Sequence, residues 1–399
     1  MFLRGVIMKE SRKATIVGTT CIFAYLVNYY LRYMLSVLTP TLLQTGNYTV
    51  AHIANLSSTY MLFYALGQLV NGFLGDIFSP KNMVTLGMLL SGGAMIIFPL
   101  TANQFLNIFC FALFGFGLSM LRGPLMKIIS ENTKGNHARL ICVFFSFSSF
   151  AGPIIASAFA LIKGWKLAFM VSGAVAIFLG FVAYTVISNM EKRNLITYIK
   201  TEVRGIYSIL SVFKIENIIF YIVVACLVEI SGASISQWLT TYFTEELNFS
   251  NEKANLLYSS VSTCRSFMPF VCLAIFRAIK ERDIPLMRVT FSITAVMFAL
   301  LIVSPNKWFS IIFLAVALMS MSCTSALLWS IYIPSLGKTG RVSSVNGVID
   351  CIGYAAAAGA NLLFANVMSN VGWNTIYILW SSIGLIGLAT TFILRRNKN

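Results

Sequence analysis

Charged residues are scarce in this sequence. Lys, Arg, Asp and Glu together make up 11% of its 399 residues, whereas about a quarter of a typical soluble domain is charged. Hydrophobic residues account for 58%, and the mean hydropathy is +0.81. This composition excludes an ordinary water-soluble protein and indicates a chain that resides in a membrane.

The residue types that most often carry catalysis or bind metals are also few or scattered. The only histidines, His52 and His137, are both predicted to lie in loops, and His137 stands beside no catalytic motif. The eight cysteines form no CxxC pair and fall in apolar stretches, as expected of small buried side chains. The sequence has no phosphate-binding loop that would imply use of ATP. We therefore predict a protein that is not an enzyme and needs no cofactor or metal.

Long apolar runs make up most of the chain instead. Each is long enough to cross about 30 Å of hydrocarbon as a helix, and helices are required because lipid offers the backbone no hydrogen-bond partners. The first run is long and no small-residue cleavage site follows it, so we expect a span there and not a cleaved signal peptide. The sequence thus predicts an all-α membrane protein of twelve transmembrane helices. The predicted spans cover residues 15–38, 54–74, 82–101, 105–129, 140–162, 167–188, 216–243, 254–276, 286–304, 308–333, 343–369 and 374–394.

The net charge of +16 is distributed unevenly between the loops. If the N-terminus is cytoplasmic, most of the 29 Lys and Arg residues lie in cytoplasmic loops and tails. The opposite side then carries only Lys163, Lys166, Lys253 and Lys307. This positive-inside pattern predicts a multi-pass protein of the plasma (cell inner) membrane with both termini in the cytoplasm, and no nucleic-acid partner.

The longest polar interruption, residues 189–214, divides the spans into six and six. Its apolar residues recur at helical spacing, which predicts an amphipathic helix on the cytoplasmic membrane surface. We therefore expect an N-terminal six-helix half over 1–188, a cytoplasmic linker over 189–214 and a C-terminal six-helix half over 215–399.

The two predicted halves share a dipeptide at corresponding positions. Gly164-Trp165 ends the fifth span, and Gly372-Trp373 ends the eleventh. Many secondary carriers are built from two such repeats, with the substrate site between them. The pattern predicts two pseudo-symmetric six-helix bundles.

Arg32 stands inside the first apolar run. A cation there costs about 2.5–3.5 kcal/mol on insertion scales, so it usually faces a partner or an interior cavity. Three polar side chains share its helix face, namely Tyr25, Asn28 and Tyr29. Guanidinium groups bind carboxylates and phosphates through paired hydrogen bonds, so this face is predicted to hold a small anion. Alternatively, a neighbouring carboxylate neutralises Arg32, and the ligand is neutral or cationic.

Other charges inside the spans suggest ion pairs. Glu229 in the seventh span and Arg265 in the eighth are expected to lie within one helical turn in depth, which favours a pair between them. Asp350 and Arg122 are both about two turns from the cytoplasmic ends of their spans, where a pair would form an inner gate. If both acids are paired in this way, Arg32 is the remaining deep charge.

The loop between the second and third spans carries a recognisable motif. Gly72-x-x-x-Asp76, followed by the basic Lys81, resembles the signature loop of the major facilitator superfamily. The glycines allow two helices to approach closely, and Asp76 is expected to meet a helix N-terminus or a base. Lys127 is expected to extend its ammonium to the headgroups.

Within that superfamily, the chain resembles the organophosphate:phosphate antiporter family of glycerol-phosphate and hexose-phosphate carriers. The resemblance rests on the form Asp76-x-x-Ser-Pro-Lys81 and on residues 29–32, 238–242 and 340–373. It implies a twelve-helix carrier in which Arg32 holds the substrate phosphate. The chain departs from the family in three places. It has no base in residues 226–238, where the family has a second arginine. It has Gln68 where the family has a lysine, and a residue at about Ser148 where the family has a histidine.

We predict a secondary active transporter of a small organic anion, a phosphate ester or a carboxylate, that works by alternating access as a monomer. A counter-anion such as phosphate, or protons, would drive it, and the direction of transport is left open. Further residues predicted to line its substrate site are Tyr64, Gln68, Gln237, Trp238 and Tyr354.

Two alternatives remain at this point. One is a proton-coupled drug exporter, because Gly152-Pro153 in the fifth span faintly resembles an antiporter motif and Glu229 or Asp350 would carry the proton. The other is a transporter-like membrane sensor, since carrier-like proteins of this family can act as receptors.

Overall fold

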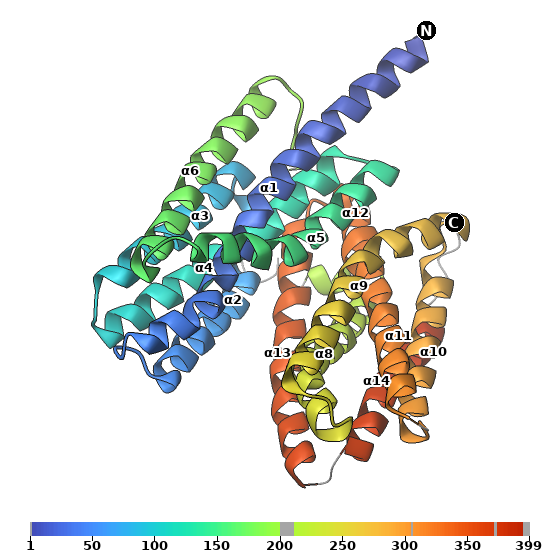
Figure 1. Ribbon diagram of the computed structural model, residues 1–399. Helices are drawn as coiled ribbons and strands as arrows, with labels where there is room; N and C mark the ends of the chain where they lie inside the picture. Colours follow the sequence, from blue (N-terminus) through green and yellow to red (C-terminus); the bar gives the residue numbers. More distant parts are fainter. Residues whose placement is uncertain (1, 200–210, 305, 371–372, 394–399) are drawn as a thin grey trace. The chain divides into compact units, whose positions relative to one another are not determined.

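The computed structural model describes residues 2–199, 211–304, 306–370 and 373–393 of the chain, without the side chains of residues 2–9, 233–238 and 361–370. This part of the protein is predominantly helical, and the described residues include no strand (Figure 1). The predicted all-α fold is confirmed.

Six long helices form the first half of the chain. In order they are α1 (Phe2–Gln44), α2 (Val50–Ile77), α3 (Pro80–Ile97, extended by the 3-10 turn Phe98–Leu100), α4 (Gln104–Asn132), α5 (Gly135–Ala160) and α6 (Trp165–Lys192).

The second half begins with the short turn Val212–Lys214. It continues with α8 (Ile218–Thr241, extended by the π-helical turn Tyr242–Glu246), α9 (Asn251–Ala278), α10 (Asp283–Ile302), α11 (Lys307–Ala326), the π-helical segment Leu327–Tyr332, α12 (Ile333–Ser335), the 3-10 turn Leu336–Thr339, α13 (Val342–Asn370) and α14 (Trp373–Ile393).

These helices account for the predicted spans. Twelve helices of at least 18 residues lie in the described part of the chain, and each overlaps one of the twelve apolar runs. Nine of them, among the residues described, also satisfy a composition criterion for crossing a membrane.

Capping side chains set the starts of corresponding helices in the two halves. Thr49 and Asn103 accept backbone N–H groups at the starts of α2 and α4. Ser250 and Asn306 do the same for α9 and α11. Such caps contribute about 1 kcal/mol each because they satisfy N–H groups that the helix itself leaves without acceptors.

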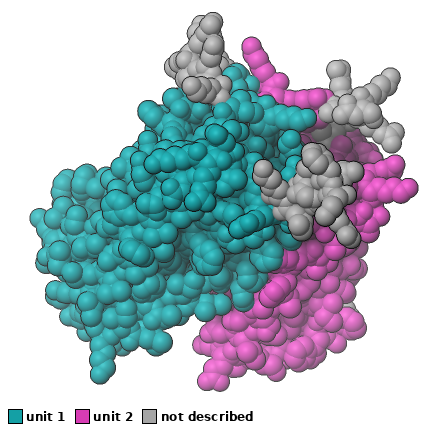
Figure 2. All heavy atoms as spheres, turned by 90° about the horizontal axis from the view of Figure 1, so that it is seen from above, with its two compact units in different colours: residues 1–212, 332–351 teal, residues 213–331, 352–399 magenta. Residues whose placement is uncertain are grey.

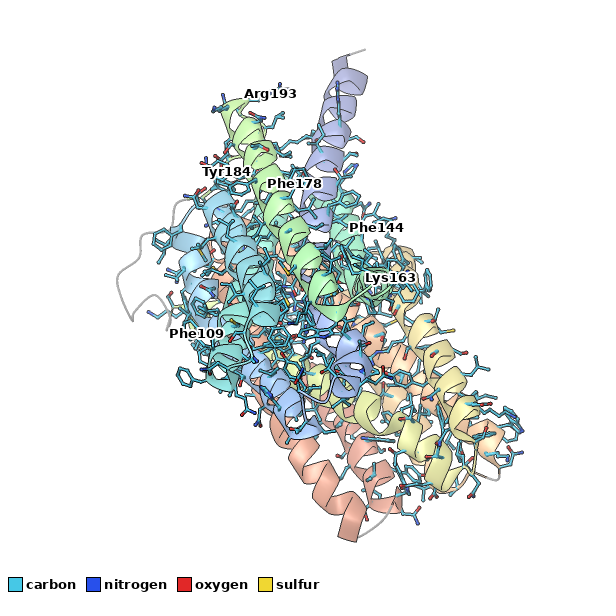
Figure 3. All side chains as sticks on the ribbon, turned by 60° about the vertical axis from the view of Figure 1, so that its left-hand side comes forward. Phe109, Phe144, Lys163, Phe178, Tyr184 and Arg193 are labelled. Atoms are coloured by element: carbon cyan, nitrogen blue, oxygen red, sulfur yellow. The ribbon has the colours of Figure 1, made fainter. Side chains whose placement is uncertain are left out.

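Large apolar side chains also lie on the outside of the bundle. Phe109, Phe144 and Phe178 are 52%, 44% and 65% exposed, and Figure 3 labels them among the side chains of the first half. Lys163 and Arg193 flank the two ends of α6 in the same view. An apolar outer surface with charges beyond the helix ends suits a hydrocarbon environment.

The structure separates into two compact units (Figure 2). Unit 1 consists of residues 1–212 and 332–351, and unit 2 of residues 213–331 and 352–399. The expected halves were continuous in sequence. The observed units are not, because the segment from Tyr332 to Cys351, including the first turns of α13, packs with the N-terminal helices.

The linker differs from the predicted amphipathic helix. α6 continues to Lys192, and residues 195–199 are not helical, so the prediction is wrong for this segment. Asn132 at the end of α4 donates to the carbonyl of Thr197 at 3.0 Å and accepts the Thr197 N–H at 2.8 Å. These bonds give the backbone of Thr197 the partners that a helix would have supplied internally. Residues 200–210 of the predicted helix lie outside the described residues.

The histidines are also placed differently from the prediction. His52 lies in the first turn of α2 and is buried, and His137 lies in the first turn of α5. Both helices begin in polar sequence, ahead of the apolar runs from which the spans were predicted. The two histidines were therefore expected in loops.

Candidate functional site

Arg32 on α1 lies among three tyrosine rings of unit 1. Its guanidinium carbon is 6.0 Å from the ring centre of Tyr29, 5.8 Å from that of Tyr60 and 5.1 Å from that of Tyr64. Tyr60 and Tyr64 are one turn apart on α2, so both face the same neighbour. Aromatic quadrupoles stabilise a cation at these distances without cancelling its formal charge. We call Arg32 and these three rings the tyrosine cage.

The rest of the predicted α1 face serves packing. Tyr25 is buried and stacks on Phe145 of α5, with ring centres 3.7 Å apart. It also meets Tyr29 edge-on at 5.3 Å. Asn28 is buried and donates to the carbonyl of Leu118 on α4 at 3.0 Å. Asn28 therefore ties α1 to α4, and its predicted substrate contact stays a prediction.

A buried ion pair lies close to the cage. Arg122 on α4 donates through Nη1 to Oδ1 of Asp350 on α13 at 2.8 Å. Asn346, one turn earlier on α13, donates to the other carboxylate oxygen at 2.9 Å. Tyr64 of the cage interacts electrostatically with both members of this pair as well as with Arg32. The structure thus contains the Arg122–Asp350 pair that the sequence suggested.

Buried amide atoms of Gln68 on α2 and Asn346 on α13 have no hydrogen-bond partner among the described residues. They are Nε2 of Gln68 and Oδ1 of Asn346, and both residues are at most 1% exposed. Buried amide groups nearly always find a partner in protein or ordered water. These two atoms can therefore bind water or a polar ligand.

Asp76 stabilises the start of α13. Its carboxylate accepts the backbone N–H groups of Ser343 at 3.2 Å and Ser344 at 2.8 Å, and also the Ser344 hydroxyl. A negative charge at a helix N-terminus is favourable because the first N–H groups lack acceptors and the helix dipole is positive there.

Lys127 on α4 completes the same cluster. Its ammonium donates to the Asp76 carbonyl at 2.9 Å and lies 3.6 Å from the carboxylate. The Lys127 side chain is only 3% exposed, so the prediction that it extends to the headgroups is wrong. A buried carboxylate nearby offers it a better partner than the interface does.

The motif glycines lie where α2 crosses α13. A Cβ on Gly72 would lie 2.8 Å from the Cα of Gly347 and 3.0 Å from the carbonyl oxygen of Ser343. A Cβ on Gly347 would overlap the carbonyl oxygen of Gln68. Only glycine permits two helix backbones to come this close.

Lys81, the basic residue of the motif, contacts α6. Its ammonium forms an ion pair with Glu191 near the end of α6 and lies 5.8 Å from the ring centre of Tyr184. It therefore joins α3 to α6, while the contacts with α13 are made by Gly72 and Asp76.

The predicted site residues Glu229, Arg265 and Tyr354 belong to unit 2. Arg265 on α9 donates through Nε to Ser322 at 3.0 Å, and a Cβ on Gly232 would lie 3.0 Å from its Nη2. A Cβ on Gly353 would lie 3.0 Å from Cγ of Glu229. The Glu229–Arg265 pair stays a prediction. Neighbouring Tyr354 is half-buried, and the side chains of Gln237 and Trp238 lie outside the described residues.

Unit 2 also contains a polar pocket of about 420 Å³. It is lined by Tyr242, Glu246, Lys307 and Tyr377 among others, and by none of the predicted site residues. Among the residues described, no group of three or more His, Cys, Asp or Glu is arranged to hold a metal ion.

Tyr60 is the cage residue that the sequence reasoning does not single out. Its position one turn before Tyr64 on the same apolar run is the signal that was available. The cage, the ion pair and the capped start of α13 are three polar features of unit 1.

The family model of the Major Facilitator Superfamily matches residues 21–358. The chain therefore belongs to this superfamily, and its long apolar helices make it a multi-pass membrane protein.

Three curated relatives are similar over part of the chain. The probable L-galactonate transporter of Escherichia coli K12 is 27% identical over 198 residues, 47% of this chain and 43% of the relative. The membrane sensor protein UhpC of Salmonella typhimurium is 24% identical over 40% of this chain and 37% of its own. The probable hexose phosphate transport protein of Chlamydia muridarum is 21% identical over 40% and 36%. Each alignment spans less than half of the relative's length.

Solved structures are similar over nearly the whole chain. The transporter FucP in its outward conformation has a TM-score of 0.75 at 12% identity, covering 96% of this chain and all of the other. The proton:xylose symporter XylE has a TM-score of 0.72 at 10% identity, covering 96% of each. At these identities the likeness establishes the fold alone.

Proposed function

We propose that this protein is a secondary active transporter of a small organic anion, and that the tyrosine cage holds the anionic group through Arg32. The observation that carries the proposal is the position of Arg32, a half-buried cation within 6.0 Å of three aromatic ring centres inside a membrane-spanning unit. A guanidinium presents paired donors to a carboxylate or a phosphate.

The names of the relatives support an acidic substrate. Galactonate carries a carboxylate and hexose phosphates carry a phosphate, and both offer hydroxyl groups as well. Gln68 and Asn346 have the buried amide atoms that would bind such hydroxyls. We place Arg32 on the acid group, with Tyr29, Tyr60 and Tyr64 around it.

The transport cycle we propose is alternating access, in which two six-helix halves rock around a central site. Contacts of α13 with Asp76 and Arg122 would hold one state closed, with Lys127 bound to Asp76, and their release would open it. We further propose that the carrier works as a monomer in the inner membrane with both termini in the cytoplasm, and that a counter-anion or protons drive it.

Uptake into proteoliposomes tests the function. The screen would use galactonate, glucose 6-phosphate, inorganic phosphate and a cationic drug, each measured on wild type and on Arg32→Ala. We expect one of the anions to be taken up, with loss of at least about tenfold in uptake for Arg32→Ala, since a charged hydrogen bond contributes about 1.5–3 kcal/mol.

The matched control is Arg288→Ala, which removes an arginine that binds Thr391 and Phe392 in unit 2. It should leave uptake unchanged. Uptake of the cationic drug alone, or normal anion uptake by Arg32→Ala, would contradict the proposal, and the first result would favour the drug exporter.

A membrane sensor is the second candidate function, because one relative is named as a sensor protein. A sensor would bind the anion without moving it. Binding of galactonate or glucose 6-phosphate by calorimetry, together with no uptake of either into proteoliposomes, would favour this alternative.

A further inference from the structure

The polar pocket of about 420 Å³ has all of its described lining residues in unit 2. They come from the ends of α8 and α10 and from the starts of α11 and α14, so the pocket lies at one end of these helices. The topology proposed above places this end on the non-cytoplasmic side. The volume is in the usual range of ligand pockets, about 300–1,000 Å³.

Two opposite charges line this pocket, Glu246 and Lys307. Among the residues that the structure describes, neither belongs to an ion pair. The Lys307 ammonium lies 4.7 Å from the ring centre of Phe249, whereas Glu246 interacts electrostatically with Tyr242 and Tyr377. Both charges therefore line one cavity without pairing with each other, so that a single ligand can contact both.

The uncharged wall of the pocket is closely packed. The rings of Tyr242 and Tyr377 meet edge-on with their centres 6.0 Å apart, and Tyr242 meets Trp373 at 5.1 Å. Both tyrosines are at most 3% exposed. Glu246 and Lys307 are exposed, so they are the side chains that can adjust to a ligand against this wall. A wall that is already ordered lowers the entropic cost of binding.

The two charges select the class of ligand. A carboxylate binds a primary ammonium through charged hydrogen bonds, and a lysine ammonium binds a carboxylate or a phosphate in the same way. A simple anion at Lys307 would share the pocket with the like charge of Glu246, and a simple cation at Glu246 would share it with Lys307. A molecule that carries both charges has a partner at each end.

We propose that this pocket binds a small zwitterion, with its primary ammonium at Glu246 and its carboxylate or phosphate at Lys307. A free amino acid has this chemistry, and so does the ethanolamine headgroup of a phospholipid. A trimethylated ammonium lacks the N–H donors that Glu246 would accept. The proposal does not depend on the anion held at Arg32, because Arg32 belongs to unit 1.

Calorimetry on the purified full chain tests the proposal with glycine and glycerophosphoethanolamine as zwitterions. Betaine and glycerophosphocholine are their trimethylated counterparts, and acetate and methylammonium carry one charge each. We expect at least one zwitterion to bind, and its trimethylated and singly charged analogues to bind at least about tenfold more weakly, because each loses a charged hydrogen bond. The proposal is wrong if neither zwitterion binds at concentrations up to about 10 mM, or if the trimethylated counterpart binds equally well.

Two variants assign the ends of the ligand. Glu246→Gln and Lys307→Gln should each weaken the zwitterion by at least about tenfold, with the Tm unchanged because both side chains are exposed. Glu252→Gln and Lys166→Gln are the matched controls, since these exposed charges lie in the first turns of α9 and α6 and do not line the pocket. The controls should stay within about threefold of wild type. Wild-type affinity in either pocket variant would contradict the assignment.

Nanodiscs distinguish the two sources of the zwitterion. A lipid headgroup in the pocket would compete with the soluble ligand, so its Kd should be weaker in phosphatidylethanolamine than in phosphatidylcholine. Equal Kd values in the two lipids would identify a free zwitterion as the ligand.

Arg32→Ala separates this inference from the proposed function. It should bind the zwitterion as wild type does. Loss of binding in Arg32→Ala but not in Glu246→Gln would assign the zwitterion to the tyrosine cage and overturn the inference. Failure of both zwitterions to bind leaves anion uptake through Arg32 untouched, whereas normal anion uptake by Arg32→Ala contradicts only the proposed function.

Discussion

At the scale of single residues, the site is built from aromatic rings and one guanidinium. The rings stabilise Arg32 through their quadrupoles. A ring does not remove the formal charge of a guanidinium, which can still donate paired hydrogen bonds to a carboxylate or a phosphate. This chemistry is the physical basis for proposing an anionic substrate for the cage.

The contribution of a ring can be separated from that of its hydroxyl. Tyr64→Ala removes a ring 5.1 Å from the Arg32 guanidinium, and should weaken binding of the transported anion by about 5- to 30-fold, as loss of a partly desolvated cation–π contact predicts. Tyr64→Phe keeps the ring and should stay within about threefold of wild type. Calorimetric Kd values provide the measurement, with Tyr184→Ala beside Lys81 as the control. Equal losses in the two Tyr64 variants would argue against a role for the ring.

At the scale of elements, the start of α13 depends on α2. Asp76 supplies acceptors to two N–H groups of its first turn, and glycines at positions 72 and 347 allow the two backbones to touch. The signature loop therefore acts on a helix that lies far away in the sequence.

Loss of the Asp76 charge should loosen this helix start. Asp76→Asn keeps the shape but removes the favourable charge–dipole interaction, so we expect a loss of about 0.3–2 kcal/mol in local stability. Hydrogen exchange should be faster at the amides of Ser343 and Ser344 and unchanged at the start of α4, which Asn103 caps. Unchanged exchange at both serines would show that the cap contributes little.

The close approach of the α2 and α13 backbones at Gly72 and Gly347 can be tested separately. Gly347→Ala places a methyl group against the backbone of α2, and overpacking of this kind costs about 1–3 kcal/mol. Gly359→Ala, on the same helix, has no heavy atom within 4 Å of the added Cβ. We expect a lower Tm for the first variant and an equal or higher Tm for the second. Similar Tm values for both variants would mean that α13 can move away from α2 at little cost.

At the scale of the whole molecule, the distribution of charge sets the orientation in the membrane. Lys163 and Arg193 flank opposite ends of α6 (Figure 3), and the positive-inside rule assigns them to opposite sides. A variant without native cysteines should react with an impermeant maleimide from outside when it carries Lys163→Cys, and only after permeabilisation when it carries Arg193→Cys. The reverse pattern would invert the topology.

Much of the fold was predictable because it depends on composition. Twelve apolar runs became twelve long helices, since a chain in lipid must satisfy its backbone hydrogen bonds within each segment. The linker was mispredicted at residues 195–199 because helical periodicity carries no information about Asn132, a residue distant in sequence that binds the backbone of Thr197. Tertiary hydrogen bonds there outweigh local preference.

The candidate site was predictable only in part, for a related reason. Arg32 and the Arg122–Asp350 pair could be found because a charge inside an apolar run is costly and needs a partner. Asn28 shares the face of Arg32 in sequence, yet it donates to Leu118, because a helix in a bundle has neighbours on more than one side. Tyr60 entered the cage through the packing of α2 on α1.

The sequence by itself determined the class of protein, the number of helices and the charges that must be accommodated, because the energy of transfer into lipid depends on residue type and not on position in space. Only the tertiary structure decided which rings surround Arg32, that Lys127 turns inward to Asp76, and that the first turns of α13 pack in unit 1. Those outcomes depend on distances of a few ångströms between residues far apart in the chain, and helix periodicity alone does not fix such distances.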